Sequence, residues 1–519
     1  METQILFNLL HDPVIRTLVT DASETPLALP ELYAALMVDS VESFSALRPH
    51  QRHAWHALLC QIGAVACLRA DLAKPPADAN DWRAALKDLT AYFPDDAPWR
   101  LVSPLDQPAF LQPVVGPVDC FRPLSTPDEL DMLVTAKNHD VKGARLLNAL
   151  PDDWLFALVS LQTMEGFLGA GNYGVSRMNG GFSNRPGFSL APPGGLGAHI
   201  RRDIEGLIAL REKTPEVFDD EGLALVWLEP WDGAASLQPK HLDPYYIEIC
   251  RRIRLVQQDG RLQAFAAGSK AARIVFGKEA KGLTGDPWTP VEFDNGDPKA
   301  LTVDARGFSY RRMSEILFEK GFKQAPLQQM SRKDEVRAMV LVARALARGQ
   351  GKTEGLHERR IVMQRRIVKL LADGQIQDLA IPASHRVEQA GLVRKALRFG
   401  LMMLFQNGPD SFQPRDPNSS KRADPFLDRF EADIDSDFFE RLFAEVEAQD
   451  GAKLEIRAHW LTDLRLRALD LLRTAEAGSP SSSIRRHRAI VRAESAFDNS
   501  FYKSFRAPYF PKDEHHDAA

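Results

Sequence analysis

The residues best suited to chemistry gather in two glycine-containing segments of this 519-residue chain. The first, Gly169-Ala170-Gly171-Asn172-Tyr173-Gly174, matches the letters of the GxGxxG dinucleotide fingerprint. That fingerprint binds a pyrophosphate only where a strand precedes it and a helix follows it. Here a helix-like apolar segment precedes the glycines, and more glycines follow. Three interpretations stay open: a nucleotide-cofactor loop, a loop that only needs positive φ angles, and a loop whose bare backbone approaches a ligand such as DNA.

The second segment, Gly351-Lys352-Thr353, resembles the end of a phosphate-binding P-loop. The full motif needs a glycine five residues before Gly351, where this chain has Leu346. His357-Glu358 begins like a zinc-protease motif, but Ile361 stands where the second histidine is required. No GxSxG nucleophile elbow occurs in the sequence. We therefore expect no catalytic activity and no cofactor.

The cysteines give no sign of a metal site. They are Cys60, Cys67, Cys120 and Cys250, and no two of them form a CxxC pair. We expect reduced cysteines, no bound metal and a cytoplasmic location. The apolar N-terminal stretch carries Asp12 and Pro13, so we expect neither a signal peptide nor a membrane span.

Positive charge is concentrated although the whole chain has a formal net charge of -5. Between residues 341 and 400 there are twelve Lys and Arg against five Asp and Glu. The basic residues of this region and of the last predicted helix are Arg344, Arg348, Lys352, Arg359, Arg360, Arg365, Arg366, Lys369, Arg485, Arg486, Arg488 and Arg492. Clustered charge of this kind suits backbone phosphates. A solvated helical face with its counter-charges elsewhere in the fold explains the count equally well.

The elements that must position these residues divide the chain into two parts. Apolar spacing of three and four residues predicts a helix from 49 to 70, and Pro30 opens another. Further helices and mixed segments follow up to about residue 330. From residue 332 glycine and proline become rare, and the predicted helices cover 333–348, 356–372, 385–406, 424–449, 452–476 and 483–500. The predicted fold is α+β: a mixed N-terminal domain, 1–375, followed by a C-terminal four-helix bundle, 376–519.

Several segments resemble one known family. They include LVSLQTMEGFLGAGNYGVSRMNGG at Leu158–Gly181, PWDG at Pro230–Gly233, YIEICRRIRL at Tyr246–Leu255 and GQGKTEGLHERR at Gly349–Arg360. Asn8-Leu9-Leu10 resembles the opening segment of the same family. In this order the segments resemble the large subunits of type I-E CRISPR Cascade complexes, the CasA family. The similarity extends over nearly the whole chain.

The resemblance implies a non-catalytic subunit of an RNA-guided complex that reads the PAM in double-stranded DNA and helps open the duplex for R-loop formation. The implied partners are target DNA, CRISPR RNA, other Cascade subunits and a recruited helicase-nuclease. The positions that match the family's DNA-reading segments are Lys137, Asn138, His139, Gly169, Gly171, Asn172, Tyr173, Arg177, Lys352, Thr353 and Glu354. A minor groove about 6 Å wide admits bare backbone better than bulky side chains, which suits the glycines.

Contacts to backbone phosphates are expected from Arg359, Arg360, Arg485, Arg486, Arg488 and Arg492. Some relatives carry a glutamine where Thr353 stands, and relatives have an aromatic residue near the loop that matches Lys137–His139. The family also uses a lysine from its middle region, which no motif locates here. A metabolic enzyme that uses the glycine loop and a helical scaffold or transcription factor are the alternative functions.

Overall fold

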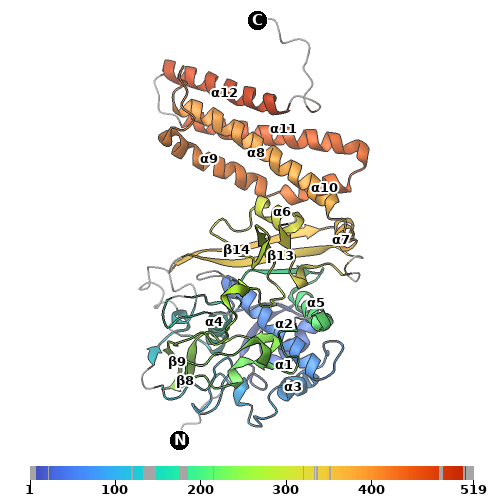
Figure 1. Ribbon diagram of the computed structural model, residues 1–519, viewed down its shortest axis with the longest axis vertical. Helices are drawn as coiled ribbons and strands as arrows, with labels where there is room; N and C mark the ends of the chain where they lie inside the picture. The colour runs from blue at the N-terminus through green and yellow to red at the C-terminus, as the bar shows by residue number, and fades with distance from the viewer. Residues whose placement is uncertain are drawn as a thin grey trace. The chain divides into compact units, whose positions relative to one another are not determined.

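The computed structural model describes most of the chain. The described residues are 7–20, 23–118, 121–131, 146, 148–167, 169–174, 177, 185–213, 216–319, 321–331, 334, 337–349, 352–478, 483–505 and 509. Two compact units are present (Figure 1). The first comprises Met1–Phe308 and Lys320–Val362, and the second comprises Ser309–Glu319 and Met363–Ala519. The second unit thus begins nearer Met363 than residue 376, and it also takes in a short helix from earlier in the chain.

The first unit is built around a helix that is buried on every side. Its helices are α1 (Leu29–Met37), α2 (Arg52–Arg69), α3 (Ala79–Asp88), α4 (Pro151–Met164) and α5 (Leu196–Leu210). All residues of α2 from His53 to Cys67 are buried, because α3, α4 and α5 pack around it. A helix that buries all of its faces belongs at the centre of a core. The predictions of a helix over 49–70 and of a helix opening at Pro30 are confirmed.

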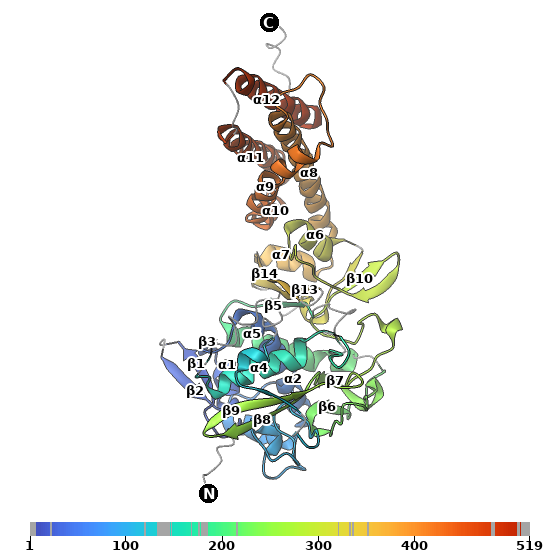
Figure 2. The same cartoon turned by 90° about the vertical axis from the view of Figure 1, so that its left-hand side faces the viewer.

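Small sheets surround these helices (Figure 2). The strands of the first unit are β1 (Ile15–Val19), β2 (Glu24–Leu27), β3 (Val41–Phe44), β4 (Arg122–Leu124), β5 (Gly187–Ala191), β6 (Leu223–Leu225), β7 (Leu242–Ile247), β8 (Arg252–Gln258), β9 (Arg261–Ala267), β10 (Val291–Asp294), β11 (Asp297–Ala300), β12 (Phe322–Lys323), β13 (Met339–Gly349) and β14 (Lys352–Met363). The sheet orders are β2-β1-β3, β4-β9-β8, β11-β10-β12, β14-β13-β5 and β6-β7. Asn295-Gly296, with φ of 51° and 89°, forms the tight turn between β10 and β11.

The predicted helices at 333–348 and 356–372 are wrong over most of their length. Residues 339–349 and 352–363 form the antiparallel strands β13 and β14, and only Arg365–Ala372 is helical, as α7. The Ala, Leu and Arg residues of this region favour a helix locally. Pairing of β13 with β5, from Val340 opposite Ala191 to Arg344 opposite Gly187, overrides that preference.

The second unit is helical. It contains α6 (Tyr310–Phe318), α7 (Arg365–Ala372), α8 (Gln377–Phe405), α9 (Pro417–Asp435), α10 (Phe438–Glu447), α11 (Asp450–Ala477) and α12 (Ser483–Phe505). The long helix α8 packs against α6, α9, α10, α11 and α12. At Gly400 the backbones of α8 and α12 approach so closely that a Cβ would lie 3.1 Å from the carbonyl oxygen of Ala493.

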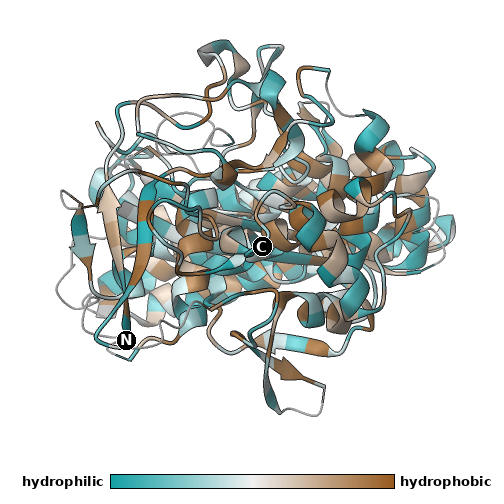
Figure 3. Ribbon diagram, turned by 90° about the horizontal axis from the view of Figure 1, so that it is seen from below, coloured by the Kyte–Doolittle hydropathy of each residue, from teal (hydrophilic) through white to brown (hydrophobic). Residues whose placement is uncertain are grey.

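One predicted helix of this unit, 424–449, is divided in two. α9 starts earlier, where the Asp416 side chain accepts a hydrogen bond from the Ser419 N–H at 2.7 Å. It ends before Ser436-Asp437, a pair of residues with short polar side chains that compete for backbone hydrogen bonds. Polar and apolar residues alternate in bands along the helices, as expected where one face of each is buried (Figure 3). Within the described residues, no helix is long and apolar enough to cross a membrane.

Candidate nucleic-acid interface

The glycine loop follows directly on the C-terminus of α4. Gly169, Gly171 and Gly174 all have positive φ, at 106°, 86° and 75°. At Gly174 the loop folds back on its own start, because a Cβ there would lie 2.6 Å from the carbonyl carbon of Gly166. At Gly169 a Cβ would meet nothing within 4 Å. The loop therefore needs glycine at its base for packing and at Gly169 for backbone conformation alone.

Gly171 lies against a segment about a hundred residues further along the chain. Its carbonyl oxygen accepts a hydrogen bond from the Ser269 N–H at 3.0 Å, and a Cβ on Gly171 would lie 3.8 Å from the Gly268 Cα. Lys270, the next residue, is exposed. The structure thus places a lysine of the middle region beside the glycine loop. Sequence spacing alone carried no signal for this contact, since it depends on the β8–β9 hairpin that ends at Ala267.

The polar residues of the glycine loop have different surroundings. Asn172 is half-buried, and its N–H donates to the carbonyl oxygen of Gly169 at 3.0 Å. Tyr173 is 36% exposed, with its ring 6.0 Å from that of Phe167. Both residues lie close to Gly169 and Gly171 in the loop.

Arg177 differs from the other residues expected at this site because it is 1% exposed. Its guanidinium donates to the carbonyl oxygens of Tyr246 at 2.8 Å and Pro244 at 3.2 Å, and it lies 3.8 Å from the Tyr246 ring centre. Its backbone N–H donates to Glu248 at 3.1 Å. Because the side chain is buried and hydrogen-bonded to protein groups, Arg177 has a structural role near the glycine loop and is not accessible to DNA.

A buried ion pair connects the β13–β14 hairpin to the base of the glycine loop. Arg348, near the end of β13, lies 2.6 Å from Glu165, the residue that follows α4. Both side chains are almost completely buried. Burial raises the pKa of the Glu165 carboxyl, whereas the charges of Arg348 and Arg251 oppose that rise. Arg251 also donates to the carbonyl oxygen of Gly166 at 3.0 Å. The two segments singled out by sequence are therefore physically coupled.

Side chains of β14 alternate between two faces, as expected for a strand. Glu354, Glu358 and Arg360 belong to the exposed set, and Thr353 and Arg359 belong to the half-buried set. Glu358 pairs with Arg344 of β13 at 3.0 Å. Arg359 and Arg360 therefore belong to opposite faces of the hairpin.

Some expected site residues lie outside what the structure describes. Lys137, Asn138 and His139 are not among the described residues, and of Lys352 only the backbone is described, as the first residue of β14. Their expected roles stay predictions.

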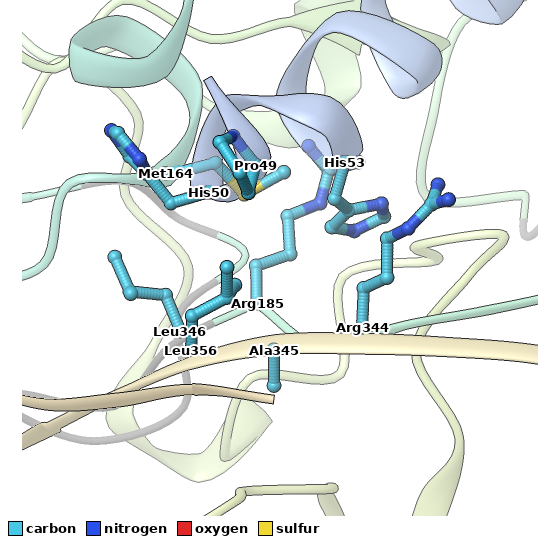
Figure 4. A pocket seen from close by; sticks show the side chains of 9 residues that line it. All are labelled: Pro49, His50, His53, Met164, Arg185, Arg344, Ala345, Leu346 and Leu356. Carbon is cyan, nitrogen blue, oxygen red and sulfur yellow. The ribbon is translucent and has the colours of Figure 1, made fainter. Parts of the chain in front are cut away.

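A small cavity lies between β13 and the segment Pro49–His53 at the start of α2 (Figure 4). His50, His53, Arg185 and Arg344 provide its polar lining, and the cavity volume is about 20 Å³. That volume is enough for about one water molecule. A larger hollow of about 660 Å³ lies between residues 282–300 and 323–329, and a third of about 370 Å³ lies along α5. The described glycine-loop residues 169–174 line none of these three cavities.

The arginines of α12 are distributed unevenly. Arg485 and Arg488 are exposed, and Arg486 and Arg492 are half-buried. Arg488 and Arg492 both pair with Asp410, at 2.8 and 2.7 Å. Arg486 instead donates to the carbonyl oxygen of Glu476 at 3.1 Å, at the end of α11. Helical spacing places Arg485, Arg488 and Arg492 on one face, with Arg486 turned away from it.

Comparison with known proteins gives one family. A family model described as CRISPR-associated protein Cse1 matches residues 8–471. CasA (Cse1) of Thermus thermophilus is 17% identical, with a TM-score of 0.65 over 96% of this chain and 99% of that chain. Cse1 of Acidimicrobium ferrooxidans is 15% identical, with a TM-score of 0.67 over 97% and 99%.

A structure described as a CRISPR RNA-guided surveillance complex contains a similar chain. It is 14% identical, with a TM-score of 0.62 over 95% of this chain and 99% of that chain. The comparison with curated proteins gives no match.

Proposed function

Because the chain belongs to the CRISPR-associated protein Cse1 family, the large subunits of type I-E Cascade, we propose that it reads the PAM of double-stranded target DNA. In this role it helps to open the duplex for R-loop formation and recruits a separate helicase-nuclease. Its partners are target DNA, CRISPR RNA and the other Cascade subunits. Guide RNA pairing supplies sequence specificity, and the protein reads only the PAM and the shape of the duplex.

The coupling of the glycine loop to two basic segments carries this proposal. Gly171 is hydrogen-bonded to the segment that presents Lys270, and Glu165 is ion-paired to the strand that leads to Lys352. Bare glycine backbone fits a narrow minor groove, and a lysine beside it supplies charge for phosphates or base edges. The hairpin tip, Lys352-Thr353-Glu354, then acts as the wedge that parts the first base pairs. Lys270 replaces Arg177 in the proposed set of DNA contacts.

A binding role requires no nucleophile and no catalytic metal, which agrees with the incomplete enzyme motifs of the sequence. The metabolic-enzyme alternative would need a small-molecule cavity at the glycine loop, and the described residues 169–174 line none of the three cavities above. We therefore expect the purified protein to hydrolyse neither ATP nor DNA.

The test is a Lys270→Ala variant assembled into the complete complex with CRISPR RNA. Target affinity should fall about tenfold, roughly 1.4 kcal/mol, on duplexes with a preferred PAM. The effect should shrink on duplexes with a non-preferred PAM, because the lysine engages DNA only when the PAM is read. Electrophoretic mobility shift with a panel of PAM sequences measures both effects.

Lys74→Ala is the matched control, since Lys74 is an exposed lysine in the loop between α2 and α3. It removes the same charge and should leave the affinities unchanged. If Lys270→Ala and Lys74→Ala bind every duplex equally well, the glycine loop and its neighbouring segment do not read the PAM.

A further inference from the structure

Two facing helices each present a pair of metal-ligand side chains. His56 and Cys60 are four residues apart on α2, and His199 and Asp203 are four residues apart on α5. Residues at this spacing share one face of a helix. α2 and α5 pack side by side in the first unit (Figures 1 and 2). All four side chains are buried, none more than 5% exposed.

The ligand atoms converge. Asp203 Oδ2 lies 2.8 Å from His56 Nε2 and 3.7 Å from His199 Nε2, and Cys60 Sγ lies 3.6 Å from His56 Nε2. The donor atoms of His56, Cys60 and Asp203 are all within 4.8 Å of one another. Bonds of about 2.0–2.3 Å to a tetrahedral zinc ion place neighbouring ligand atoms about 3.3–3.7 Å apart. Two of the separations match that range, and the third opens by about 0.5 Å when its hydrogen bond is exchanged for a metal.

Several polar groups converge on one oxygen of this cluster. Both imidazoles approach the same carboxylate oxygen of Asp203 through Nε2. Trp288 Nε1 donates to Asp203 Oδ2 at 3.2 Å, and Arg202 lies 3.2 Å from the other oxygen. Ser189 Oγ lies 2.7 Å from His199 Nε2. Of these neighbours, Arg202 resembles the outer groups that orient ligands in metal sites, because it contacts the carboxylate oxygen that faces away from the imidazoles.

We propose that His56, Cys60 and Asp203 bind one zinc ion, with His199 Nε2 as the fourth ligand once it leaves Ser189. The Cys60 thiol gives up its proton to solvent and binds as thiolate. A divalent cation then balances one thiolate and one carboxylate, while the imidazoles stay neutral. Such a neutral cluster can be buried where a lone ion could not.

The site is structural because all four ligands come from the protein and are closed off from solvent. It fixes α5 to α2, and α5 packs on β5, the strand that pairs with β13. The ion therefore supports the sheet from which the β13–β14 hairpin extends. This inference does not depend on the proposed reading of the PAM.

The experiment is elemental analysis of the full-length protein after exposure to a weak chelator and gel filtration. We expect about one zinc per chain, reduced at least about tenfold in Cys60→Ser and in Asp203→Asn. Cys67→Ser is the matched control. Cys67 is a second buried cysteine of α2 that lies outside the cluster, so this variant should keep its zinc.

A readout on the unmodified chain covers the case in which the variants do not fold. After replacement of zinc by Co²⁺, the protein should show the near-ultraviolet charge-transfer band of a thiolate–cobalt bond. The band should persist in Cys67→Ser. Native protein that retains less than about 0.1 zinc per chain and gives no such band overturns the proposal, as does equal zinc retention by Cys60→Ser and the native chain.

Discussion

At the scale of single residues, the glycine loop separates what sequence can predict from what it cannot. A loop that needs positive φ angles is one of the three interpretations of residues 169–174, and φ is positive at Gly169, Gly171 and Gly174. The neighbour of Gly171, the segment around Gly268, could not be predicted because the contact joins distant parts of the chain. At Arg177 the expectation from the sequence differs from the structure. A basic residue beside a predicted DNA loop suggests a DNA contact, yet burial against Tyr246 gives it a structural role.

Two substitutions at Gly171 test the loop. Asn and Asp are similar in size, and both adopt positive φ more readily than other non-glycine residues, so they impose similar backbone cost. Only Asp adds a negative charge, which DNA phosphates repel. We expect Gly171→Asp to bind target DNA at least about tenfold more weakly than Gly171→Asn, a difference of roughly 1.4 kcal/mol. A mobility-shift assay on the assembled complex measures the difference.

Circular dichroism of both variants should match that of the native subunit, because loops tolerate substitution better than cores. Equal DNA affinities for the Asp and Asn variants would show that Gly171 lies away from the phosphates.

At the scale of elements, the largest error of prediction is the region 339–363. Its composition favours helix, and residues 353–360 alternate between half-buried and exposed, a period of two that only the structure makes visible. Strand pairing of β13 with β5 decides the outcome, and β5 lies about 150 residues earlier in the chain. By contrast, α2 and α11 were predicted well, because helical periodicity is a local property of the sequence.

The coupling of hairpin and glycine loop through Arg348 and Glu165 predicts a large effect of Glu165→Gln. Removing one charge leaves a buried guanidinium incompletely paired, and breaking such pairs costs about 3–5 kcal/mol. The remaining amide oxygen still accepts a hydrogen bond, so we expect stability in urea unfolding to fall by about 2–3 kcal/mol. PAM discrimination by the assembled complex should decline with it, since both proposed reading segments depend on the pair.

Glu358→Gln provides the comparison within the same hairpin. The Arg344–Glu358 pair joins the two strands but is more exposed, and surface pairs contribute about 0–1 kcal/mol. If both variants are destabilised by the same small amount and keep full PAM discrimination, the Arg348–Glu165 pair does not couple the two segments.

At the scale of the whole molecule, the sequence predicted the mixed fold, the C-terminal helical region and the family, and all three are confirmed. Amphipathic helices and ordered motifs carry that information locally. The division of the chain was harder to predict. The second unit takes in α6, from residues 310–318, because Tyr310 and Arg311 bind Glu431 of α9. No local sequence pattern indicates that a helix packs with elements much later in the chain.

The distribution of charge over the whole chain determines how we expect α12 to bind DNA. The chain has a net charge of -5, so binding to DNA depends on local patches in which acidic residues compete with phosphates for the same arginines. Asp410 is such a competitor, because hydrogen bonds from Arg492 and Arg488 lower its pKa and keep it charged.

Asp410→Asn should therefore strengthen target binding by the assembled complex. It should also steepen the dependence of affinity on salt, because the freed arginines can release counterions from phosphates.

The triple change of Arg485, Arg488 and Arg492 to alanine should weaken target binding and flatten the dependence of affinity on salt. It should reduce the salt slope by about 0.7–0.9 for each phosphate that the protein no longer neutralises. Arg486→Ala is the control, since that guanidinium caps α11 and faces away from the other three.

Salt titrations on two PAM sequences distinguish these roles. Phosphate contacts position the duplex and carry no sequence information, so every α12 variant should shift the affinity for both PAM sequences equally. A triple variant that changes the ratio between the two PAM sequences while its salt slope stays native would mean that α12 reads bases. The glycine loop would then no longer be the reading element, because the discrimination assigned to Gly171 and Lys270 would come from the second unit.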